Sequence, residues 1–515
     1  MADDAAIVRK CSMFESMMDM LQSHAQTMIT CYWLTLSTTV PVTEETVMAA
    51  LRQLYRRVCN LRLVYRKNSD DDTCFAQMPE ERIDLQTIEA DDVQETFIRL
   101  TRTSFNGTVG PLWRVRITSS TSISVHDKSE SFSTKSSEFG YENNVLFGFH
   151  HGITDGFTSV RLIGHFMNFL NKAIAGDLVD SSEQLAELAD FDLNNMEVLQ
   201  KIMSQMADPL ENDELEKEFN GYAEVKPVFL KAIPALGEVE NTTLSLRHDF
   251  DEESTKKFLS LCKSNGVSCH TGFTTVLKVA LLELVQSHGL DQEEYEMLTM
   301  HVTNGRRYWD TIKIDTERQY GACFIATPLR MKLPKNAQEN FWIHAKELHK
   351  TFHSNLKNVF SFKYIIIAVA AQGLSAGFDE MQKLSNTDSS SLDTAGANTN
   401  DTSSASPNPT IDSGNGQNQM RPLPSFDTTN MGDVTDFLSG KFAKQNGEPA
   451  NEYAVIRDFT RLTSTHAHKE NICSHVFHTY NGRLMYSLAY NTCFMTSATA
   501  AEYVRIIADV MQSLL

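Results

Sequence analysis

Residues 145–156 read Val-Leu-Phe-Gly-Phe-His-His-Gly-Ile-Thr-Asp-Gly, an apolar run that ends in two histidines and continues into an aspartate and a glycine. The apolar part predicts a strand, and alternation along it turns the two histidines to opposite faces. The face with His151 also carries Val145, Phe147 and Phe149, and the face with His150 carries Leu146 and Gly148. Only one histidine is therefore able to face a reaction centre.

Gly152 begins a turn after this strand, and a helix follows whose apolar residues recur at helical spacing. Its buried face is expected to hold Phe157, Val160, Ile163, Met167 and Leu170. A histidine at such a turn, with Asp155 four residues on and Gly156 after it, is well placed for catalysis. The imidazole pKa is ordinarily ~6.5, so His151 can accept a proton near neutral pH.

The spacing itself favours function over packing. In a chain of this composition, His-His-x-x-x-Asp-Gly arises by chance on the order of once in a thousand sequences, whereas His-x-x-x-Asp-Gly arises in roughly one in twenty. The alternative is a pair of structural histidines at a strand end.

Composition limits the class of protein. The chain has 515 residues, 41% hydrophobic and 22% charged, which is ordinary for globular proteins and long enough for two or three units. Its formal net charge is −20. An acidic chain repels phosphate backbones, and no basic cluster with interleaved aromatics is visible, so we expect no nucleic-acid partner.

The chain also lacks signals for export or membrane insertion. Residues 1–6, Met-Ala-Asp-Asp-Ala-Ala, do not have the basic and then apolar order of a signal peptide, and the most apolar later run, 364–371, is far shorter than the ~20 residues of a membrane helix. The nine cysteines are scattered and never spaced Cys-x-x-Cys, a usage typical of free thiols in a reducing compartment. These features predict a cytoplasmic protein without a membrane span.

Two distant stretches share one local order of strand, cap and helix. In the first, a strand at 31–36 precedes a helix capped by Thr43 and carrying Val47, Leu51, Leu54 and Val58. In the second, a strand at 243–246 precedes a helix capped at Asp251 and carrying Phe258, Leu259 and Leu261, and a second helix covers 271–286. We therefore expect two α/β halves, residues 1–185 and 241–515, joined by a helical crossover at 186–240.

Two polar segments are not expected to contribute to the hydrophobic core of either half. Residues 118–143 are serine-rich and lie between two apolar strands, which predicts a long hairpin loop. Residues 385–420 consist mostly of Ser, Thr, Asn, Asp, Gly and Pro, with too little apolar surface to offset the entropy of ordering. We expect that insertion to be disordered.

The C-terminal end predicts a hairpin and a helix. Residues 474–480 and 483–490 flank Asn481-Gly482, a pair that tolerates positive φ at both positions of a two-residue turn. A helix from about Ala500 follows, with Thr499 and Glu502 at capping-box spacing.

The sequence resembles a known superfamily at the motif His150 to Gly156. His-His-x-x-x-Asp-Gly is the signature of the condensation-domain and chloramphenicol-acetyltransferase-like superfamily, which includes peptide-synthetase condensation domains, polyketide-associated acyltransferases and alcohol acetyltransferases. Weaker similarities follow in the family's order along most of the chain. They are Cys59-Asn60-Leu61-Arg62, Pro111-Leu112-Trp113-Arg114-Val115, Asn304-Gly305-Arg306, Tyr320-Gly321-Ala322-Cys323-Phe324 and Thr428-Thr429-Asn430-Met431-Gly432.

The resemblance implies two chloramphenicol-acetyltransferase-like α/β halves that form a V with a central channel. It implies that His151 is the catalytic histidine and that His150 is structural. Asp155 would shape the loop through an arginine, for which Arg306 is the candidate. A backbone N–H near Gly156 would stabilise a developing oxyanion. Residues of the second half, Thr429 and Asn430, would line the substrate channel.

The implied activity is transfer of an acyl group from a thioester to a hydroxyl or amine. The co-substrate would be acyl-coenzyme A or a carrier-bound acyl group, with no bound cofactor and no metal. The chain lacks the Asp-Phe-Gly-Trp-Gly motif of the plant branch, which favours the alcohol acetyltransferase and condensation branches. We expect no attached carrier domain, so any carrier protein would act in trans. The alternative is a catalytically silent binding or scaffold protein of the same fold.

Other groupings carry weaker signals. Residues 373–377, Gly-Leu-Ser-Ala-Gly, match the serine-hydrolase pattern, with Asp433 or Asp458 and His466 or His468 as partners. The group His466, His468, Cys473, His475 and His478 lacks the usual zinc spacings, and a solvated strand face is the favoured interpretation. His349 and His353, four apart on a predicted helix, are expected at the surface.

Overall fold

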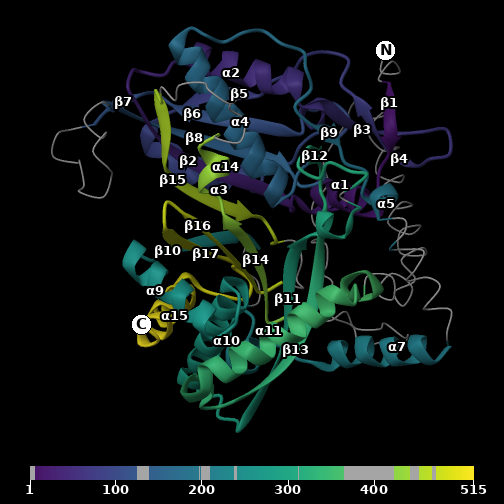
Figure 1. Cartoon of the computed structure of the whole chain (residues 1–515), viewed down its shortest axis with the longest axis vertical. Coiled ribbons are helices and arrows are strands. Elements are labelled where there is room, and N and C mark those ends of the chain that lie inside the picture. Colours follow the sequence, from purple (N-terminus) through teal and green to yellow (C-terminus); the bar gives the residue numbers. More distant parts are fainter. Residues whose placement is uncertain are drawn as a thin grey trace, which may run out of the picture.

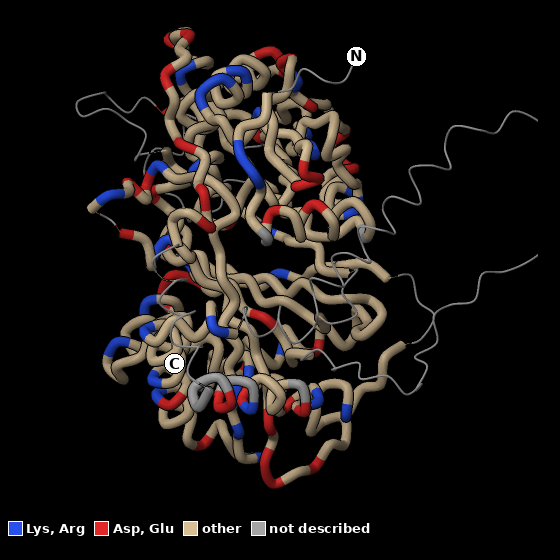
Figure 2. Tube along the Cα trace, turned by 90° about the vertical axis from the view of Figure 1, so that its right-hand side faces the viewer, with Lys and Arg blue, Asp and Glu red and all other residues tan. Residues whose placement is uncertain are grey.

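The protein, seen here as a computed structural model, has two sheet-bearing halves (Figure 1). The structure describes residues 6–123, 139–195, 198, 209–236, 241–310, 312–364, 423–440, 452–466 and 471–515. The predicted loop core at 124–138 and the insertion at 385–420 lie outside these ranges. Acidic and basic residues are interspersed along both halves (Figure 2).

The first half contains a six-stranded sheet with strand order β15-β2-β8-β6-β5 and with β7 beside β8. Its strands are β2 (Ile29–Thr38), β5 (Leu85–Ile88), β6 (Trp113–Thr118), β7 (Thr121–Ser122), β8 (Tyr141–His150) and β15 (Ala454–Thr463). Its helices are α1 (Met13–Ala25), α2 (Glu44–Arg57), α3 (Val93–Leu100) and α4 (Gly156–Ala175). A three-stranded sheet of order β1-β4-β3 adjoins it, formed by β1 (Ile7–Lys10), β3 (Leu63–Lys67) and β4 (Thr73–Gln77).

Helices cover both faces of this sheet. On one face, Phe147 of β8 packs edge-on against Phe166 of α4, with ring centroids 5.2 Å apart. On the other face, Trp33 of β2 packs against Phe97 of α3, 5.7 Å away. The predicted buried face of α4 is largely confirmed, because Val160, Ile163, Met167 and Leu170 are buried, while Phe157 is only partly buried.

The second half contains a six-stranded sheet with strand order β10-β17-β16-β14-β11-β13. Its strands are β10 (Thr243–Asp249), β11 (Glu294–Asn304), β13 (Phe324–Pro334), β14 (Phe426–Asp433), β16 (Cys473–Tyr480) and β17 (Arg483–Asn491). Its helices are α8 (Val228–Ala232), α9 (Glu252–Ser264), α10 (Cys269–Ser287), α11 (Phe341–Lys357) and α15 (Ser497–Ser513). Helix α14 (Thr435–Leu438), which follows β14, packs against α4 of the first half. Between the halves in sequence lie β9 (Glu187–Leu188), α5 (Phe191–Asn194) and α7 (Pro209–Glu224), and β9 pairs in parallel with β12 (Gln319–Tyr320).

Alternate residues of β17 show how the two halves contact each other. Leu484, Tyr486 and Leu488 belong to the core of the second half, which includes residues of α9, α10, α11 and α15. Met485 and Ala489 belong to the core of the first half. Since neighbouring residues of a strand point to opposite faces, the second sheet has helices on one face and the first half on the other.

The prediction of two α/β halves is confirmed. One strand does not follow the chain order, because β15 pairs antiparallel with β2 of the first sheet although it comes from the region beyond residue 241 (Figure 1). The division into 1–185, 186–240 and 241–515 stays a prediction.

Several local predictions are also settled. The hairpin of β16 and β17 is confirmed, with Asn481 at φ 48° and Gly482 at φ 76°. The capping box at Thr499 is wrong, because α15 begins earlier and Thr496 accepts the hydrogen bond from the Thr499 N–H. The predicted face of α9 is wrong in part, since Phe258 is buried but Leu259 is exposed.

Candidate active site

His151 lies in the turn between β8 and α4, and its ring orientation is fixed by one short contact. Its Nδ1 lies 2.7 Å from the carbonyl oxygen of Thr154. A carbonyl only accepts hydrogen bonds, so Nδ1 carries the proton and Nε2 keeps an unprotonated lone pair in the neutral ring. Phe324, the first residue of β13, packs against the imidazole with ring centroids 4.8 Å apart.

Burial keeps this imidazole neutral. His151 is 8% exposed. Burial, followed by the nearby positive charge of Arg461, lowers the pKa of His151 to about 4, although the Thr154 carbonyl and Asp155 act in the opposite direction. Nε2 is therefore a proton acceptor throughout the neutral pH range.

His150 points to the other face of the sheet, as predicted. Its Nδ1 accepts the backbone N–H of Gly152 at 3.0 Å, and its Nε2 lies 3.6 Å from Asp19 of α1. Its ring packs against Tyr65, with centroids 5.2 Å apart. These contacts hold the start of the turn and leave His150 away from His151.

Asp155 caps α4 and pairs with Arg306. One carboxylate oxygen accepts the N–H of Thr158 at 2.8 Å. The other lies 2.6 Å from Nη1 of Arg306 and accepts the N–H of Cys323 at 2.9 Å. Burial alone would raise the pKa of Asp155, but Arg306 and these hydrogen bonds lower it below its ordinary value. The carboxylate is thus ionised and fully engaged, and the predicted pairing with Arg306 is present.

Arg306 links the two halves around this carboxylate. It is 3% exposed and lies in a 3-10 turn, Gly305–Tyr308, that follows β11. Its remaining donors reach the carbonyls of Gln319 and Gly321 and the hydroxyl of Thr158, at 2.8 to 3.2 Å. The guanidinium therefore fixes the start of α4 to the segment before β13.

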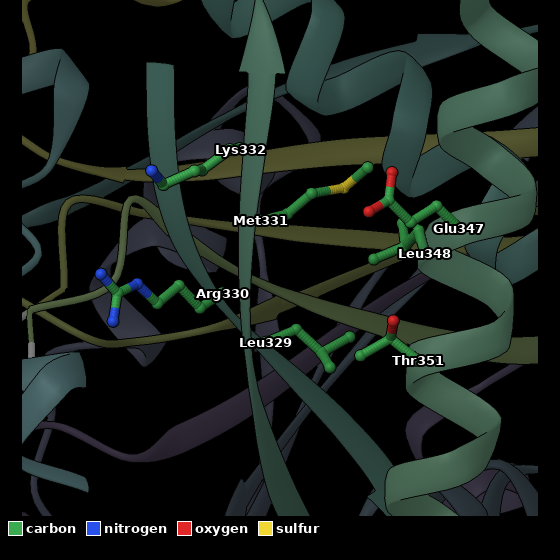
Figure 3. A pocket seen from close by; sticks show the side chains of 7 residues that line it. All are labelled: Leu329, Arg330, Met331, Lys332, Glu347, Leu348 and Thr351. Atoms are coloured by element: carbon green, nitrogen blue, oxygen red, sulfur yellow. The ribbon is translucent and has the colours of Figure 1, made fainter. Parts of the chain in front are cut away.

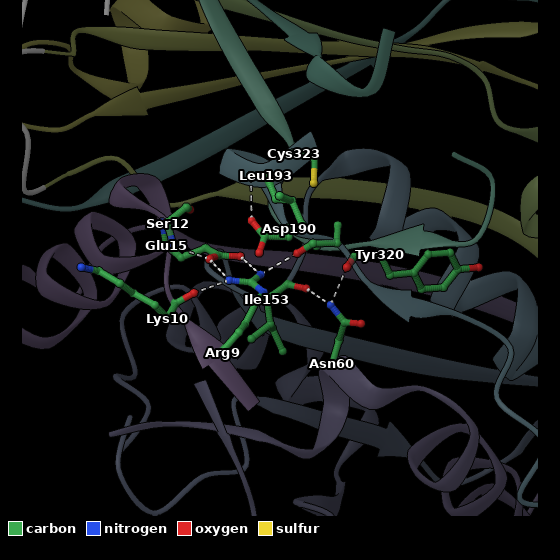
Figure 4. A network of polar contacts seen from close by, with 12 residues as sticks. Arg9, Lys10, Ser12, Glu15, Asn60, Ile153, Asp190, Leu193, Tyr320 and Cys323 are labelled. Atoms are coloured by element: carbon green, nitrogen blue, oxygen red, sulfur yellow. Dashed lines mark hydrogen bonds and ion pairs between the residues drawn. The ribbon is translucent and has the colours of Figure 1, made fainter. Parts of the chain in front are cut away.

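Asn60 makes a second link to the turn that holds His151 (Figure 4). It is fully buried, and its Nδ2 donates to the carbonyl of Ile153 at 3.1 Å and to that of Tyr320 at 3.0 Å. The same view shows Arg9 paired with Glu15 at 2.7 Å. Asn60 thus holds the middle of the motif against β12, a strand distant in sequence.

Gly156 and β14 meet at the start of α4. A Cβ on Gly156 would lie 3.7 Å from the side chain of Met431, an ordinary contact distance. Strand alternation puts Thr429 on the same face as Met431, and Asn430 on the opposite face with the buried Thr428. The Oδ1 of Asn430 accepts the N–H of Gly432 at 2.8 Å. The channel and the roles of Thr429 and Asn430 stay predictions.

Comparisons with known proteins agree on the fold. The trichothecene 15-O-acetyltransferase of Fusarium sporotrichioides matches at a TM-score of 0.61 and 12% identity, over 98% of this chain and 94% of that one. Polyketide synthase associated protein 5 of Mycobacterium tuberculosis matches at a TM-score of 0.59 and 12% identity, over 99% of this chain and 98% of that one. The epimerization domain of the third module of tyrocidine synthetase B matches at a TM-score of 0.58 and 13% identity, over 100% of this chain and 98% of that one. The chain has the condensation-domain fold. Neither the protein-family models nor the curated protein sequences gave a match.

In this condensation-domain fold, the other groupings of the sequence have mixed outcomes. Residues 373–377 of the serine-hydrolase pattern lie outside the described ranges. Cys473 and His475 lie on one face of β16 and His478 lies on the other, and all three are buried, so the predicted solvated strand face is wrong. Within the described residues, no group of three or more His, Cys, Asp or Glu could hold a metal, and no helix has the length and apolar character to cross a membrane.

A groove on the second half is also separate from the motif (Figure 3). It lies between β13 and α11 and has a volume of about 200 Å³. Its lining residues are Leu329, Arg330, Met331, Lys332, Glu347, Leu348 and Thr351, and none is a candidate catalytic residue.

Sequence reasoning did not assign roles to four residues near His151. Asn60 and Phe324 lie in segments noted only for their resemblance to the family, and Thr154 falls at a variable position of the motif. Arg461 lies in no motif, and no pattern in the sequence assigned it a role. Their proximity depends on contacts between distant segments.

Proposed function

We propose that the protein transfers an acyl group from a thioester to a hydroxyl or amine, with Nε2 of His151 as the general base. Nε2 would take the proton of the acceptor as its oxygen or nitrogen attacks the thioester carbonyl, and would return it to the leaving thiolate. The observation that supports this most is the contact between His151 Nδ1 and the Thr154 carbonyl, which leaves Nε2 unprotonated.

The surrounding residues suit this role. Gly156 is the first residue of α4, where the helix leaves its backbone N–H groups without internal partners. Such an N–H can stabilise the negative charge that develops on the thioester oxygen. Acyl-coenzyme A or a carrier-bound acyl group would be the co-substrate, and an alcohol or amine would be the acceptor.

The test is an assay of thiol release by the purified protein. A panel of acyl-coenzyme A donors is incubated with and without candidate alcohols and amines. We expect acceptor-dependent thiol release, and His151→Ala should lower it about 10²–10⁴-fold. The variant should stay folded but melt lower, because it loses a buried ring and its hydrogen bond to the Thr154 carbonyl. His353→Ala, at an exposed position on α11, serves as the control. Near-normal turnover by His151→Ala would disprove the assigned role.

The alternative is a silent binding protein. It stays open because the fold does not fix the activity: the solved structures with this fold include an epimerization domain as well as an acetyltransferase. Saturable binding of an acyl-coenzyme A without thiol release, under any acceptor tested, would favour that alternative.

A further inference from the structure

Arg461 is a buried cation on the same face of the first sheet as His151. In register, Arg461 of β15 lies opposite Tyr32 of β2, which lies opposite Phe147 of β8. Residues opposite one another on neighbouring strands point to the same face, which is also the face of His151 by alternation from Phe147. Arg461 is only 5% exposed.

Arg461 has unsatisfied donors in a small polar cluster. In the described part of the chain, Nε and Nη1 of Arg461 and both ring nitrogens of His478 are buried without a hydrogen bond. The Tyr32 hydroxyl interacts with the side chains of Ser159 and Arg461. These four residues are called the Arg461 cluster. Tyr32, Ser159 and Arg461 come from the first half, and His478 comes from β16, in register with Met485 on the face of the second sheet that meets the first half.

Asp427 of β14 feels the charge of Arg461 but forms no ion pair with it. Its carboxylate accepts hydrogen bonds from the Ser474 hydroxyl at 2.7 Å and from Asn471. Burial raises the pKa of Asp427 to about 6, although these hydrogen bonds and the charge of Arg461 act in the opposite direction. Within the described residues, no carboxylate forms an ion pair with Arg461, whereas the buried guanidinium of Arg306 has Asp155. Burying a charge without a partner is costly, so a protein keeps one chiefly where a ligand supplies the opposite charge.

The cluster is within electrostatic reach of the proposed base. After burial, the charge of Arg461 is the largest cause of the lowered pKa of His151. The same charge offsets part of the effect of burial on the Tyr32 hydroxyl, whose pKa is raised. An anion bound by Arg461 would therefore lie beside the reacting groups.

We propose that the Arg461 cluster binds a carboxylate of the substrate and holds it next to His151. The site offers one guanidinium and two hydroxyls, a donor set that matches a carboxylate. This inference rests on the proposed acyl transfer for its biological meaning, although binding itself does not require turnover. The phosphates of coenzyme A lie at the far end of the pantetheine arm, so the carboxylate belongs either to a dicarboxylic acyl group or to a hydroxy or amino acid acceptor.

The first experiment measures binding without catalysis. Melting temperatures are recorded in acetate, lactate and succinate against sodium chloride of equal ionic strength, for the wild type, Arg461→Met and Arg116→Met. Arg116, in β6 of the same sheet, pairs with Asp84 at 2.9 Å and is the matched control.

We expect at least one carboxylate to raise the wild-type melting temperature. Arg461→Met should lose that rise and, in chloride, melt at or above the wild type, because it removes an unpaired buried charge. Arg116→Met should melt lower but keep the rise. The proposal is overturned if no carboxylate stabilises the wild type, or if Arg461→Met keeps the stabilisation.

The second experiment identifies the source of the carboxylate. In one assay, succinyl-coenzyme A and acetyl-coenzyme A are compared as donors, with a neutral alcohol as the acceptor. In the other, lactate and its methyl ester are compared as acceptors, with acetyl-coenzyme A as the donor. Arg461→Met should lower kcat/KM about 30-fold or more for the carboxylate-bearing partner only. Equal losses for charged and neutral partners would overturn the proposal even if transfer occurs. If carboxylates bind but no combination of donor and acceptor gives transfer, the proposed function is rejected and the proposal of a carboxylate-binding site stands.

Discussion

At the scale of single residues, Asp155 and Arg306 share one interaction. Removing either partner leaves the other as an uncompensated buried charge, a loss of ~3–5 kcal/mol. We therefore expect Asp155→Asn and Arg306→Ala each to lower both stability and turnover, and the double variant to be little worse than either. Thermal melts and kinetics of the full double-mutant cycle measure this, and fully additive losses would show that the pair does not act as a unit.

Gly152 offers a sharper test of the turn. A Cβ at this position would overlap the hydroxyl of Tyr65, a buried ring that also packs against His150. Gly152→Ala should therefore lower the melting temperature markedly. Adding Tyr65→Phe removes the overlapping oxygen and should restore part of the loss, although Tyr65→Phe alone also gives up a 3.3 Å hydrogen bond to the Glu15 carbonyl.

The measurement is the melting temperature of the two single variants and the double variant. A double variant that melts at the sum of the two single losses would mean that the strain at Gly152 does not arise from Tyr65.

The sequence predicted the residues whose geometry is local. Strand alternation was enough to send His150 and His151 to opposite faces. Arg306 was reached only through the family resemblance, since 151 residues separate it from Asp155. Arg461 was not found, because no local pattern shows that β15 crosses to the first sheet.

At the scale of elements, Asn60 ties together a 3-10 turn, β12 and the turn that holds His151. Asn60→Ala would leave the Ile153 carbonyl buried without a donor, which costs roughly 1–3 kcal/mol, whereas the Tyr320 carbonyl keeps the N–H of Ala189 at 2.8 Å. We expect a lower melting temperature and, because Ile153 lies inside the motif, a lower kcat. Asn171→Ala is the control, since Asn171 also bonds two backbone segments but at the far end of α4.

Urea unfolding and single-turnover kinetics of both variants test this. Loss of stability in both but loss of kcat only in Asn60→Ala is the expected result. Equal effects on kcat would mean that Asn60 has no particular role in holding the turn.

Helix boundaries illustrate what local sequence leaves open. Thr43 and Asp251 were correctly predicted as caps, and each accepts a hydrogen bond from the backbone N–H three residues on. Near the C-terminus, Thr496 and Thr499 both precede an apolar run, and the hairpin that ends at Asn491 leaves room for the earlier cap. Tertiary context therefore decided between two equivalent residues.

At the scale of the whole molecule, buried neutral histidines set the acid limit of stability. Burial lowers the pKa of His475 to about 3, and that of His165 and His478 to about 3 as well. The unfolded chain has a histidine pKa of ~6.5, so between that pH and about 3 it binds protons that the folded state does not. Stability is thus fully present above pH 6.5 and falls as the pH is lowered.

His475→Gln should reduce this pH dependence. Each buried histidine contributes about 1.4 kcal/mol per pH unit within its window. Urea unfolding at pH 7, 6, 5 and 4.5 should therefore show a shallower fall for His475→Gln than for the wild type. His24→Gln, at an exposed position, should follow the wild type. An unchanged slope for His475→Gln would mean that this residue is protonated in the folded state.

The two-half architecture was predictable because each half repeats one local order of strand, cap and helix. The contact between the halves was not predictable, because consecutive residues of one strand point to opposite faces and pack in different cores. Met485 and Tyr486 are neighbours that belong to different cores, and no periodicity distinguishes an inward face toward helices from one toward another sheet.

The position of β15 has a consequence for synthesis on the ribosome. Ile29 of β2 bonds to Ser464, 435 residues further along the chain, so the outer edge of β2 has no partner until translation has nearly finished. At a translation rate of about 5–20 residues per second, this edge stays unpaired for roughly 20 to 90 s. An unpaired edge containing Tyr32, Trp33 and Leu34 is a template for aggregation during that interval. Chaperone supply during expression should therefore control the yield of native protein, and fragments truncated before residue 454 should accumulate in inclusion bodies.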